Sequence, residues 1–134
     1  MNPGSNWQPT ATVRTLRKRA AMLTRARDFF AARSVLEIET PVLCAHSSSD
    51  THIKSLQLAA AHGGLWLRTS PEYHMKRLLA AGIGDIYQIG RAFRADETGA
   101  RHQPEFTMIE WYRNAFSMQD MMAETCALIT SLGE

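Results

Sequence analysis

The chain has 134 residues, of which 45% are hydrophobic and 21% charged, and this length and composition suit one globular domain with a real core. No uninterrupted apolar run of about 18 residues is present, and the N-terminus lacks the basic-then-apolar layout of a signal peptide, so a membrane span and secretion are not indicated and we expect a cytoplasmic protein. Cys44 and Cys126 stand far apart without a neighbouring Cys or His pair, which argues against a disulfide framework and a zinc site.

The formal net charge of +2 is too small to indicate nucleic-acid binding by itself, but the basic residues are unevenly distributed. Seven of the fifteen occur between positions 14 and 33, where only Asp28 opposes them: Arg14, Arg17, Lys18, Arg19, Arg25, Arg27 and Arg33. Two interpretations remain open. The segment is a solvated helix face, or it forms a surface for an acidic partner such as tRNA or an acidic protein.

The first forty residues predict an arm, a helix and a strand in that order. Residues 1–12 are rich in Pro, Ser, Thr and Asn and predict an irregular arm. From 13 to about 34, apolar residues recur at helical steps and predict one buried stripe, made of Val13, Leu16, Ala20, Leu23 and Phe30. Residues 35–40 alternate as in a half-buried strand that stops at Pro41, and residues 43–52 are typical of a loop.

Two short strands are expected at 53–58 and 65–69, around a glycine-containing turn. A helix should follow, because Ser70 is a good N-cap, Pro71 fits the first helical position and Glu72 suits the positive end. Gly82 is expected to close it.

Residues 85–93 and 105–113 predict two long strands that form an antiparallel hairpin around a polar loop. Ser117 with Asp120 then resembles a capping arrangement for a last helix. The apolar face of that helix is expected to consist of Met118, Met121, Met122, Leu128, Ile129 and Leu132.

The hairpin concentrates the residues that could carry chemistry. Because every second residue of a strand shares a face, Phe106, Met108, Glu110 and Tyr112 should line one wall. A carboxylate on an apolar wall is costly to bury unless it meets a cation, and Arg94 at the hairpin neck has the geometry to hold a phosphate with two hydrogen bonds. The pattern therefore fits a ligand with a phosphate, an aromatic group and an amine. The alternative is that the aromatic residues belong to the core and the charges are solvated.

Three segments resemble, in order, those of the class II aminoacyl-tRNA synthetases of the lysine and aspartate subgroup. The segment FFAARSVLEIETPVL, at about 29–43, resembles motif 1 of that family. The segment TSPEYHMKRLLAAGIGDIYQIGRAFR resembles its amino-acid-binding segment. The pattern FRxxxxxxRHxPEFTMxExY, within about 91–113, resembles motif 2. The resemblance covers roughly residues 7–134. It implies an α/β (α+β) fold, in which residues 13–134 form the first part of a catalytic domain with an antiparallel sheet flanked by helices.

The resemblance also implies an ATP site. Arg94 would be the catalytic residue, which holds the α-phosphate of ATP, and Phe106 would stack on the adenine. His102 would contact the outer phosphates with help from Arg101. The family has a glutamate two places after the arginine, where this chain has Asp96 followed by Glu97, and either carboxylate is a candidate for that role.

For the amino acid, the resemblance implies a lysine-type pocket made by Ser70, Glu72, Glu110 and Tyr112. A pair of carboxylates suits a diamine, because each ammonium group needs a counter-charge once it leaves water. Two structural alternatives stay open, since Glu72 could merely cap its helix and Glu110 could belong to an internal ion pair. Motif 1 further implies a homodimer.

The dimer interface would include Phe29, Phe30 and Pro41. Only about a dozen residues precede the helix that leads into motif 1, whereas lysyl-tRNA synthetases carry an anticodon-binding barrel there. That feature and the wording SPEYHMKRLLAAG resemble the branch that activates lysine or β-lysine and transfers it to a lysine of elongation factor P. A tRNA acceptor, as in a lysyl-tRNA synthetase, is the alternative, and a non-catalytic dimerisation or binding module is the alternative of another class.

The resemblance stops before motif 3, the segment that backs the adenine and follows the acidic Mg²⁺ ligands in this family. We therefore expect the Mg²⁺ ligands in a C-terminal half, no metal site within these residues, and little or no activity from the chain alone. Whether α-lysine or β-lysine is preferred stays open.

Overall fold

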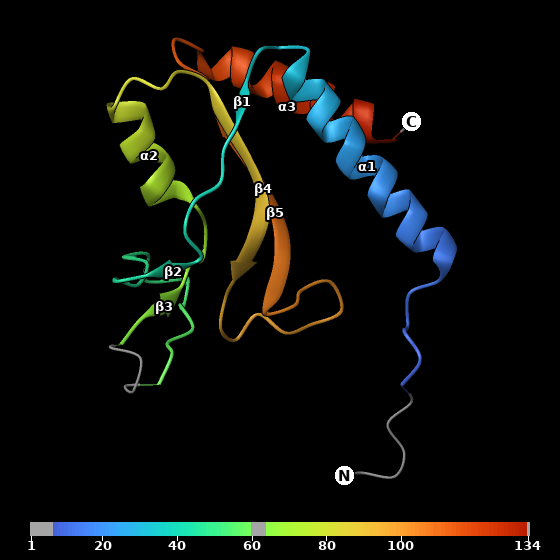
Figure 1. Ribbon diagram of the computed structural model, residues 1–134, viewed down its shortest axis with the longest axis vertical. Coiled ribbons are helices and arrows are strands. Elements are labelled where there is room, and N and C mark those ends of the chain that lie inside the picture. Colours follow the sequence, from blue (N-terminus) through green and yellow to red (C-terminus); the bar gives the residue numbers. More distant parts are fainter. Residues whose placement is uncertain (1–6, 60–63, 134) are drawn as a thin grey trace.

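The computed structural model describes residues 7–59 and 64–133 (Figure 1). In chain order the elements are α1 (Val13–Ala31), β1 (Leu36–Glu37), β2 (Leu43–Cys44), β3 (Trp66–Leu67), α2 (Glu72–Ala80), β4 (Ile86–Phe93), β5 (Glu105–Tyr112) and α3 (Met118–Gly133). Strands β1, β4 and β5 form one sheet, and β2 pairs with β3 in another. None of the helices among these residues is both long enough and apolar enough to cross a bilayer. The mixed α/β class expected from the sequence is confirmed.

Helix α1 begins at Thr12, whose Oγ1 accepts the N–H of Thr15 at 3.1 Å. The helix ends three residues earlier than expected, because the chain turns at Ser34 with a positive φ of 55°. The expectation of one buried stripe is wrong for the first half of the helix. Its buried residues are Ala26, Phe29 and Phe30, all in the second half, whereas Val13 and Leu16 are exposed. The second half packs its phenylalanines on the sheet, and the first half reaches it through Arg19, whose Nη2 donates to Thr107 Oγ1 of β5 at 2.6 Å (Figure 1).

Strand β1 lies parallel to β4, whereas β4 and β5 form the expected antiparallel pair, so the three-stranded sheet is mixed. The backbone of residues 35–40 is extended over part of its length, with Leu36 N–H bonded to the Asp85 carbonyl and Ile38 N–H to that of Tyr87. The alternation did not specify which face is buried: Val35 is 4% exposed and packs in the core, whereas Leu36 is 53% exposed. The backbone that enters from the Ser34 turn fixes this orientation, which periodicity alone does not specify.

The second sheet was only partly expected. Residues 43–52 were expected to form a loop, but Leu43–Cys44 forms β2 and pairs antiparallel with Trp66–Leu67. The expected strand at 53–58 is reduced to a bridge between Gln57 and Trp66 and adjoining backbone bonds. The turn between them falls largely at 60–63, outside the described residues. These short pairings bring the segment before α2 beside the end of β4.

Helix α2 ends as the sequence predicts but begins one residue later, because Pro71 is its N-cap and Glu72 its first helical residue. The Oγ of Ser70, the residue before the cap, accepts the N–H of Glu72 at 3.0 Å. At the other end Gly82 takes a φ of 80°, a left-handed conformation that favours glycine. Helix α2 therefore presents its N-terminus to the hairpin end that carries Arg94.

The hairpin of β4 and β5 is the centre of the fold and confirms the expected antiparallel pair. Eight residue pairs run in register from Ile86 opposite Tyr112 to Phe93 opposite Glu105. One face, which we call the core face, carries Tyr87, Ile89, Ile109 and Trp111. The other, which we call the site face, carries Gln88, Gly90 and Ala92 opposite Glu110, Met108 and Phe106.

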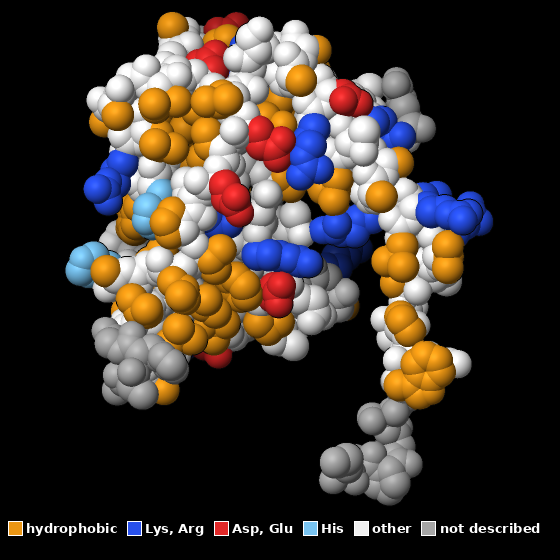
Figure 2. Space-filling model, viewed as in Figure 1, with side chains coloured by type: hydrophobic (Ala, Val, Ile, Leu, Met, Phe, Trp, Pro, Cys, Tyr) orange, Lys and Arg blue, Asp and Glu red, His pale blue; other side chains and the backbone are white. Residues whose placement is uncertain are grey.

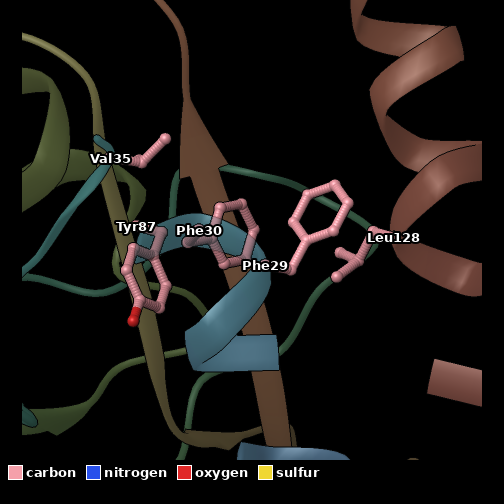
Figure 3. Packing of buried hydrophobic residues seen from close by; sticks show 5 residues of the cluster. All are labelled: Phe29, Phe30, Val35, Tyr87 and Leu128. Atoms are coloured by element: carbon pink, nitrogen blue, oxygen red, sulfur yellow. The ribbon is translucent and has the colours of Figure 1, made fainter. Parts of the chain in front are cut away.

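The core lies between the core face and helices α1 and α3. Phe30 is fully buried and stacks on Tyr87 at 4.3 Å between ring centroids, while Phe29 meets Phe30 edge-on at 5.4 Å. Figure 3 shows these rings in a row between Val35 and Leu128 of α3. Burial of two phenyl rings anchors the end of α1 to the hairpin.

Helix α3 starts at a reciprocal cap, in which Asp120 N–H donates to Ser117 Oγ and Asp120 Oδ2 accepts from the Ser117 N–H and hydroxyl. Its expected apolar face is only partly buried. Leu128 packs in the core, whereas Met118, Met122 and Ile129 are exposed. The helix is instead held partly by charge, because buried Glu124 lies 3.5 Å from Arg113, which also approaches Asp85 at 3.5 Å.

Replacement of Glu124 by Ala should destabilise the chain by about 2–4 kcal/mol, because it removes a buried counter-charge of Arg113. Chemical unfolding monitored by circular dichroism measures this change. Glu105→Ala is the matched control, since its ion pair with Arg91 is solvent-exposed and should contribute less than about 1 kcal/mol. Equal losses in the two variants would show that the buried network does not hold α3 in place.

Candidate functional site

Two adjoining hollows lie on the site face, and Arg94 lines both. The first, with an open volume of about 930 Å³, is bounded by the β4–β5 loop and contains Arg94, Asp96, Glu97, Thr98, Arg101, His102, Gln103 and Phe106. The second, of about 890 Å³, lies toward α2 and contains Ser48, Ser49, Asp50, Ile53, Thr69, Ser70, Glu72, Tyr73, Arg94, Met108 and Glu110. We call the two together the cleft. Each half is large enough for a small-molecule ligand.

Arg94 occupies the boundary between the two halves because it directly follows the last residue of β4. Its backbone N–H donates to the Pro104 carbonyl at 2.9 Å, and its Nε donates to the Thr69 carbonyl at 3.4 Å. Its guanidinium carbon lies 5.2 Å from the centroid of Phe106, and Nη1 lies 3.6 Å from a Glu97 oxygen. The Arg94 guanidinium is thus held by Thr69, Phe106 and Glu97 while it lines the cleft. A guanidinium in this position suits a phosphate.

The loop between the strands supplies further charges. Asp96 takes a positive φ of 63° and pairs with Lys54 at 2.8 Å, and Ala95 N–H donates to the Lys54 carbonyl. Asp96 is therefore turned toward Lys54, whereas its neighbour Glu97 meets Arg94. Of the two candidate carboxylates, Glu97 is the one in contact with the expected phosphate-binding residue.

Arg101 and His102 lie on the same loop and are exposed. Backbone bonds between Gly99 and His102 in both directions, at 3.1 and 3.4 Å, close a turn that holds them at the mouth of the first half. Both side chains can therefore reach an anionic ligand that projects from the cleft toward solvent.

Three carboxylates line the other half of the cleft, and two of them, Glu72 and Glu110, were expected from the sequence. Glu72 accepts from Lys76 one helical turn later, at 2.5 Å, and this bond raises the pKa of Lys76. Glu110 accepts from the Tyr112 hydroxyl at 3.1 Å. Burial, and then the negative charge of Glu110, raise the pKa of Tyr112 well above that of an ordinary phenol. Tyr112 touches Glu110 without lining the hollow, so it orients the carboxylate from behind.

The segment 48–50 closes the second half and was not expected from the sequence. Ser49 bonds to the Tyr73 hydroxyl through its N–H at 3.1 Å and its Oγ at 2.5 Å, and these bonds lower the pKa of Tyr73. Asp50 Oδ1 accepts the N–H of His52 and stabilises the loop. The run SSSDTH had the composition of such a turn but gave no signal of where it would pack.

The structure brings nearly all of the expected ligand-binding residues to the cleft. Arg94, Asp96, Glu97, Arg101, His102 and Phe106 line the first half, Ser70, Glu72 and Glu110 line the second, and Tyr112 supports Glu110. Ser70 also accepts the N–H of Glu72, and Glu72 also pairs with Lys76, so both residues have partners within the chain as well as a place in the cleft. Their roles toward a ligand stay predictions.

The residues expected at a dimer interface differ in how exposed they are. Phe29 and Phe30 are 7% and 0% exposed and pack in the core, so they offer almost no surface to a second copy. Pro41 is exposed at the turn after β1. The direct interface role expected for the two phenylalanines therefore disagrees with their burial, and their observed role is to hold α1 on the hairpin.

A metal site was not expected within these residues. Across 7–59 and 64–133, no three or more His, Cys, Asp or Glu side chains gather in a way that could hold a metal ion. The Mg²⁺ that the family resemblance implies stays an expectation for other residues, and we assign no step to that ion.

The fold and the cleft define an α/β domain that presents a cation and an aromatic ring near paired carboxylates, and comparison with known proteins gives its family. Residues 7–134 match the family described as tRNA synthetases class II (D, K and N). This match spans nearly the whole chain. The chain therefore belongs to that family.

Curated relatives place the chain near one branch. It is 48% identical over 138 residues to the elongation factor P--(R)-beta-lysine ligase of Yersinia enterocolitica, which covers 98% of this chain. The proteins of the same name from Haemophilus influenzae and Vibrio cholerae are each 48% identical, over 96% and 93% of this chain. The chain spans 42%, 42% and 40% of the lengths of these three relatives.

Replacing Glu110 with Gln should lower the pKa of Tyr112 toward the ordinary phenol value of 10.0, because the neighbouring negative charge is gone. The pKa of Tyr87, which burial and Glu37 raise to about 12, should not change. Spectrophotometric titration of tyrosinate absorbance measures both groups.

The same variant should change the pH dependence of stability. A phenol whose pKa is raised on folding stabilises the folded chain fully below its unfolded pKa of about 10, and this contribution is lost as the pH rises further. Glu110→Gln should therefore lose less stability above pH 10 than the unchanged chain, and Tyr112→Phe serves as the control without that phenol. An unchanged Tyr112 titration in Glu110→Gln would contradict the proposed contact.

Proposed function

We propose that the chain binds ATP and lysine or β-lysine side by side in the cleft, as part of an ATP-dependent ligase that makes an aminoacyl adenylate. The observation that carries this proposal is the position of Arg94, which borders both halves. In an aminoacyl adenylate the α-phosphate joins the nucleotide to the amino acid. A cation at the boundary between two hollows suits that phosphate better than it suits two unrelated ligands.

The first half suits the nucleotide. Phe106 offers an aromatic face for adenine, and Arg94 already lies over the same ring. Arg101 and His102 at the mouth suit the outer phosphates. Glu97 pairs with Arg94, so phosphate binding would exchange one anion for another at that guanidinium.

The second half suits a diamine. Glu72 and Glu110 come from different elements, the start of α2 and the middle of β5, and both line the hollow. One ammonium group of lysine or β-lysine would meet each carboxylate, with Lys76 displaced from Glu72. Ser70 adds a hydroxyl beside Glu72. The cleft does not by itself distinguish α-lysine from β-lysine, but the names of the curated relatives favour (R)-β-lysine.

The proposed reaction has two steps. A carboxylate oxygen of the amino acid attacks the α-phosphorus of ATP, the new P–O bond forms, and pyrophosphate leaves. Arg94 would stabilise the negative charge that develops on the α-phosphate in this step. An amine of the acceptor then attacks the carbonyl carbon of the mixed anhydride, an amide bond forms, and AMP leaves.

For the acceptor we propose a lysine of elongation factor P. Support comes from the names of the relatives and from the exposed basic residues of α1, namely Arg14, Arg17, Lys18 and Arg19, which attract an acidic partner. Figure 2 shows Lys and Arg side chains gathered on the α1 side of the molecule. Elongation factor P and ATP are both cytoplasmic, so the proposal also places the chain there. A tRNA acceptor has the same charge but no support from those names.

We also propose a homodimer formed through motif 1. Several large apolar side chains on α1 and the following strands are 43–64% exposed: Val13, Leu16, Met22, Leu36 and Leu43. Their burial against a second copy would cover this apolar surface. The same surface is compatible with a purely interacting module, and only ligand binding separates that rival from the enzyme.

Calorimetric titration of the 134-residue chain with ATP and with a lysyl-sulfamoyl adenylate analogue tests the proposal. We expect saturable binding of both, and Arg94→Ala should weaken each by about tenfold or more, because a charged hydrogen bond to a phosphate is lost. Glu72→Gln and Glu110→Gln should weaken the analogue while leaving ATP almost unchanged. Arg91→Ala, whose exposed side chain pairs with Glu105 outside the cleft, is the control. Absence of saturable heat with either ligand would favour the interaction module.

A further inference from the structure

A second arginine lies behind the cleft, and no role was expected for it. Arg68 follows β3 and is only 5% exposed. Its Nε donates to the Arg91 carbonyl at 2.9 Å, and its Nη1 donates to the Thr40 carbonyl and hydroxyl, each at 2.8 Å. One guanidinium therefore joins β4 to the turn that follows β1.

The site face is shaped to receive this guanidinium. In the amide orientation that satisfies both its polar atoms, Gln88 Oε1 accepts from Arg68 at 2.9 and 3.0 Å, and its Nε2 donates to Thr40 Oγ1 at 2.8 Å. Gly90 lies beside it, and a Cβ on that glycine would come within 2.6 Å of Arg68 Nη2. A side chain at position 90 would therefore displace the arginine.

The backbone of Arg68 is tied to the same elements. Its N–H donates to the Val42 carbonyl at 3.0 Å, and its carbonyl accepts the N–H of Phe93 at 2.9 Å. Phe93 directly precedes Arg94, and Thr69 directly follows Arg68 and leads into Ser70 and α2. Arg68 is thus the point at which the strand carrying Arg94 meets the segment carrying Glu72.

A buried cation needs compensation, and here most of it comes from carbonyl dipoles rather than a contacting carboxylate. Burial lowers the pKa of Arg68, while Cys44, Glu39 and Glu110 oppose that change, and the guanidinium stays charged. An apolar residue would fill this space without the desolvation cost, so the arginine is better explained by the geometry it imposes than by net stability.

We propose that Arg68 is a positioning residue that sets the distance between the phosphate-binding Arg94 and the amine-binding Glu72 and Glu110. This inference rests on the proposed function. ATP alone or lysine alone uses one half of the cleft and tolerates a shift of the other half. An aminoacyl adenylate spans both halves and requires the correct spacing between them.

The test compares three dissociation constants in each variant. The quantity of interest is the product of the constants for ATP and lysine divided by the constant for the lysyl-sulfamoyl adenylate analogue, all measured by calorimetry. Arg68→Met should lower this ratio about tenfold. A smaller population of folded chain alone would weaken all three ligands alike and would raise the ratio, because two of the three constants stand in its numerator. Arg113→Met is the matched control, because it removes another buried arginine. Arg113 pairs with Glu124 of α3 and does not line the cleft. Its ratio should equal that of the unchanged chain.

Two further variants keep the test valid if Arg68→Met does not fold. Gly90→Ala leaves Arg68 in place but displaces its guanidinium, and it should lower the ratio in the same direction. Arg68→Lys retains the charge and one set of contacts to Thr40 and should recover part of the ratio. Normal ratios in both Gly90→Ala and Arg68→Lys overturn the inference. Failure of the unchanged chain to bind the analogue overturns the proposed function itself, and this inference with it.

Discussion

The in-register ladder between β4 and β5 assigns every side chain of the hairpin to one of two faces. Tyr87 and Trp111 point to the core, where Phe30 packs on both rings, and the next residues along the strands point to the cleft. A slip of one residue would exchange the faces and place Glu110 against the core. Burial of Phe30 on one face therefore fixes the position of Glu110 and Phe106 on the other. The core and the cleft are specified by the same register.

The cleft is polarised along the hairpin, and charged residues at each end pair with one another. Glu97 meets Arg94 at one end, and Lys76 meets Glu72 at the other. A ligand with a phosphate and an amine can take the place of both internal partners, Glu97 at Arg94 and Lys76 at Glu72. A ligand with only one of these groups replaces only one of them. This matching explains why a mixed phosphate and amino compound suits the cleft better than a simple anion or cation.

The elements with strong local signals were predictable, and those set by tertiary contacts were not. Strand alternation and the polar loop predicted the hairpin, and Gly82 predicted the end of α2, because these signals are local. The burial of α1 was overestimated, since periodicity shows a face but not whether anything covers it. The same limit applies to Leu36, whose exposure depends on the turn before it. In retrospect the sequence held one sign that Arg68 is buried, since this lone cation directly follows the apolar residues LWL. Its partners come from distant segments, so the sequence did not indicate what it contacts.

The central claim is that one cleft holds the two ends of an aminoacyl adenylate with Arg94 between them. The most direct measurement is a crystal structure of the chain with the lysyl-sulfamoyl adenylate analogue. We expect adenine on Phe106, the sulfamoyl group in place of the α-phosphate against Arg94, and the amines at Glu72 and Glu110. An analogue bound elsewhere, or one whose amines lie away from both carboxylates, would contradict it.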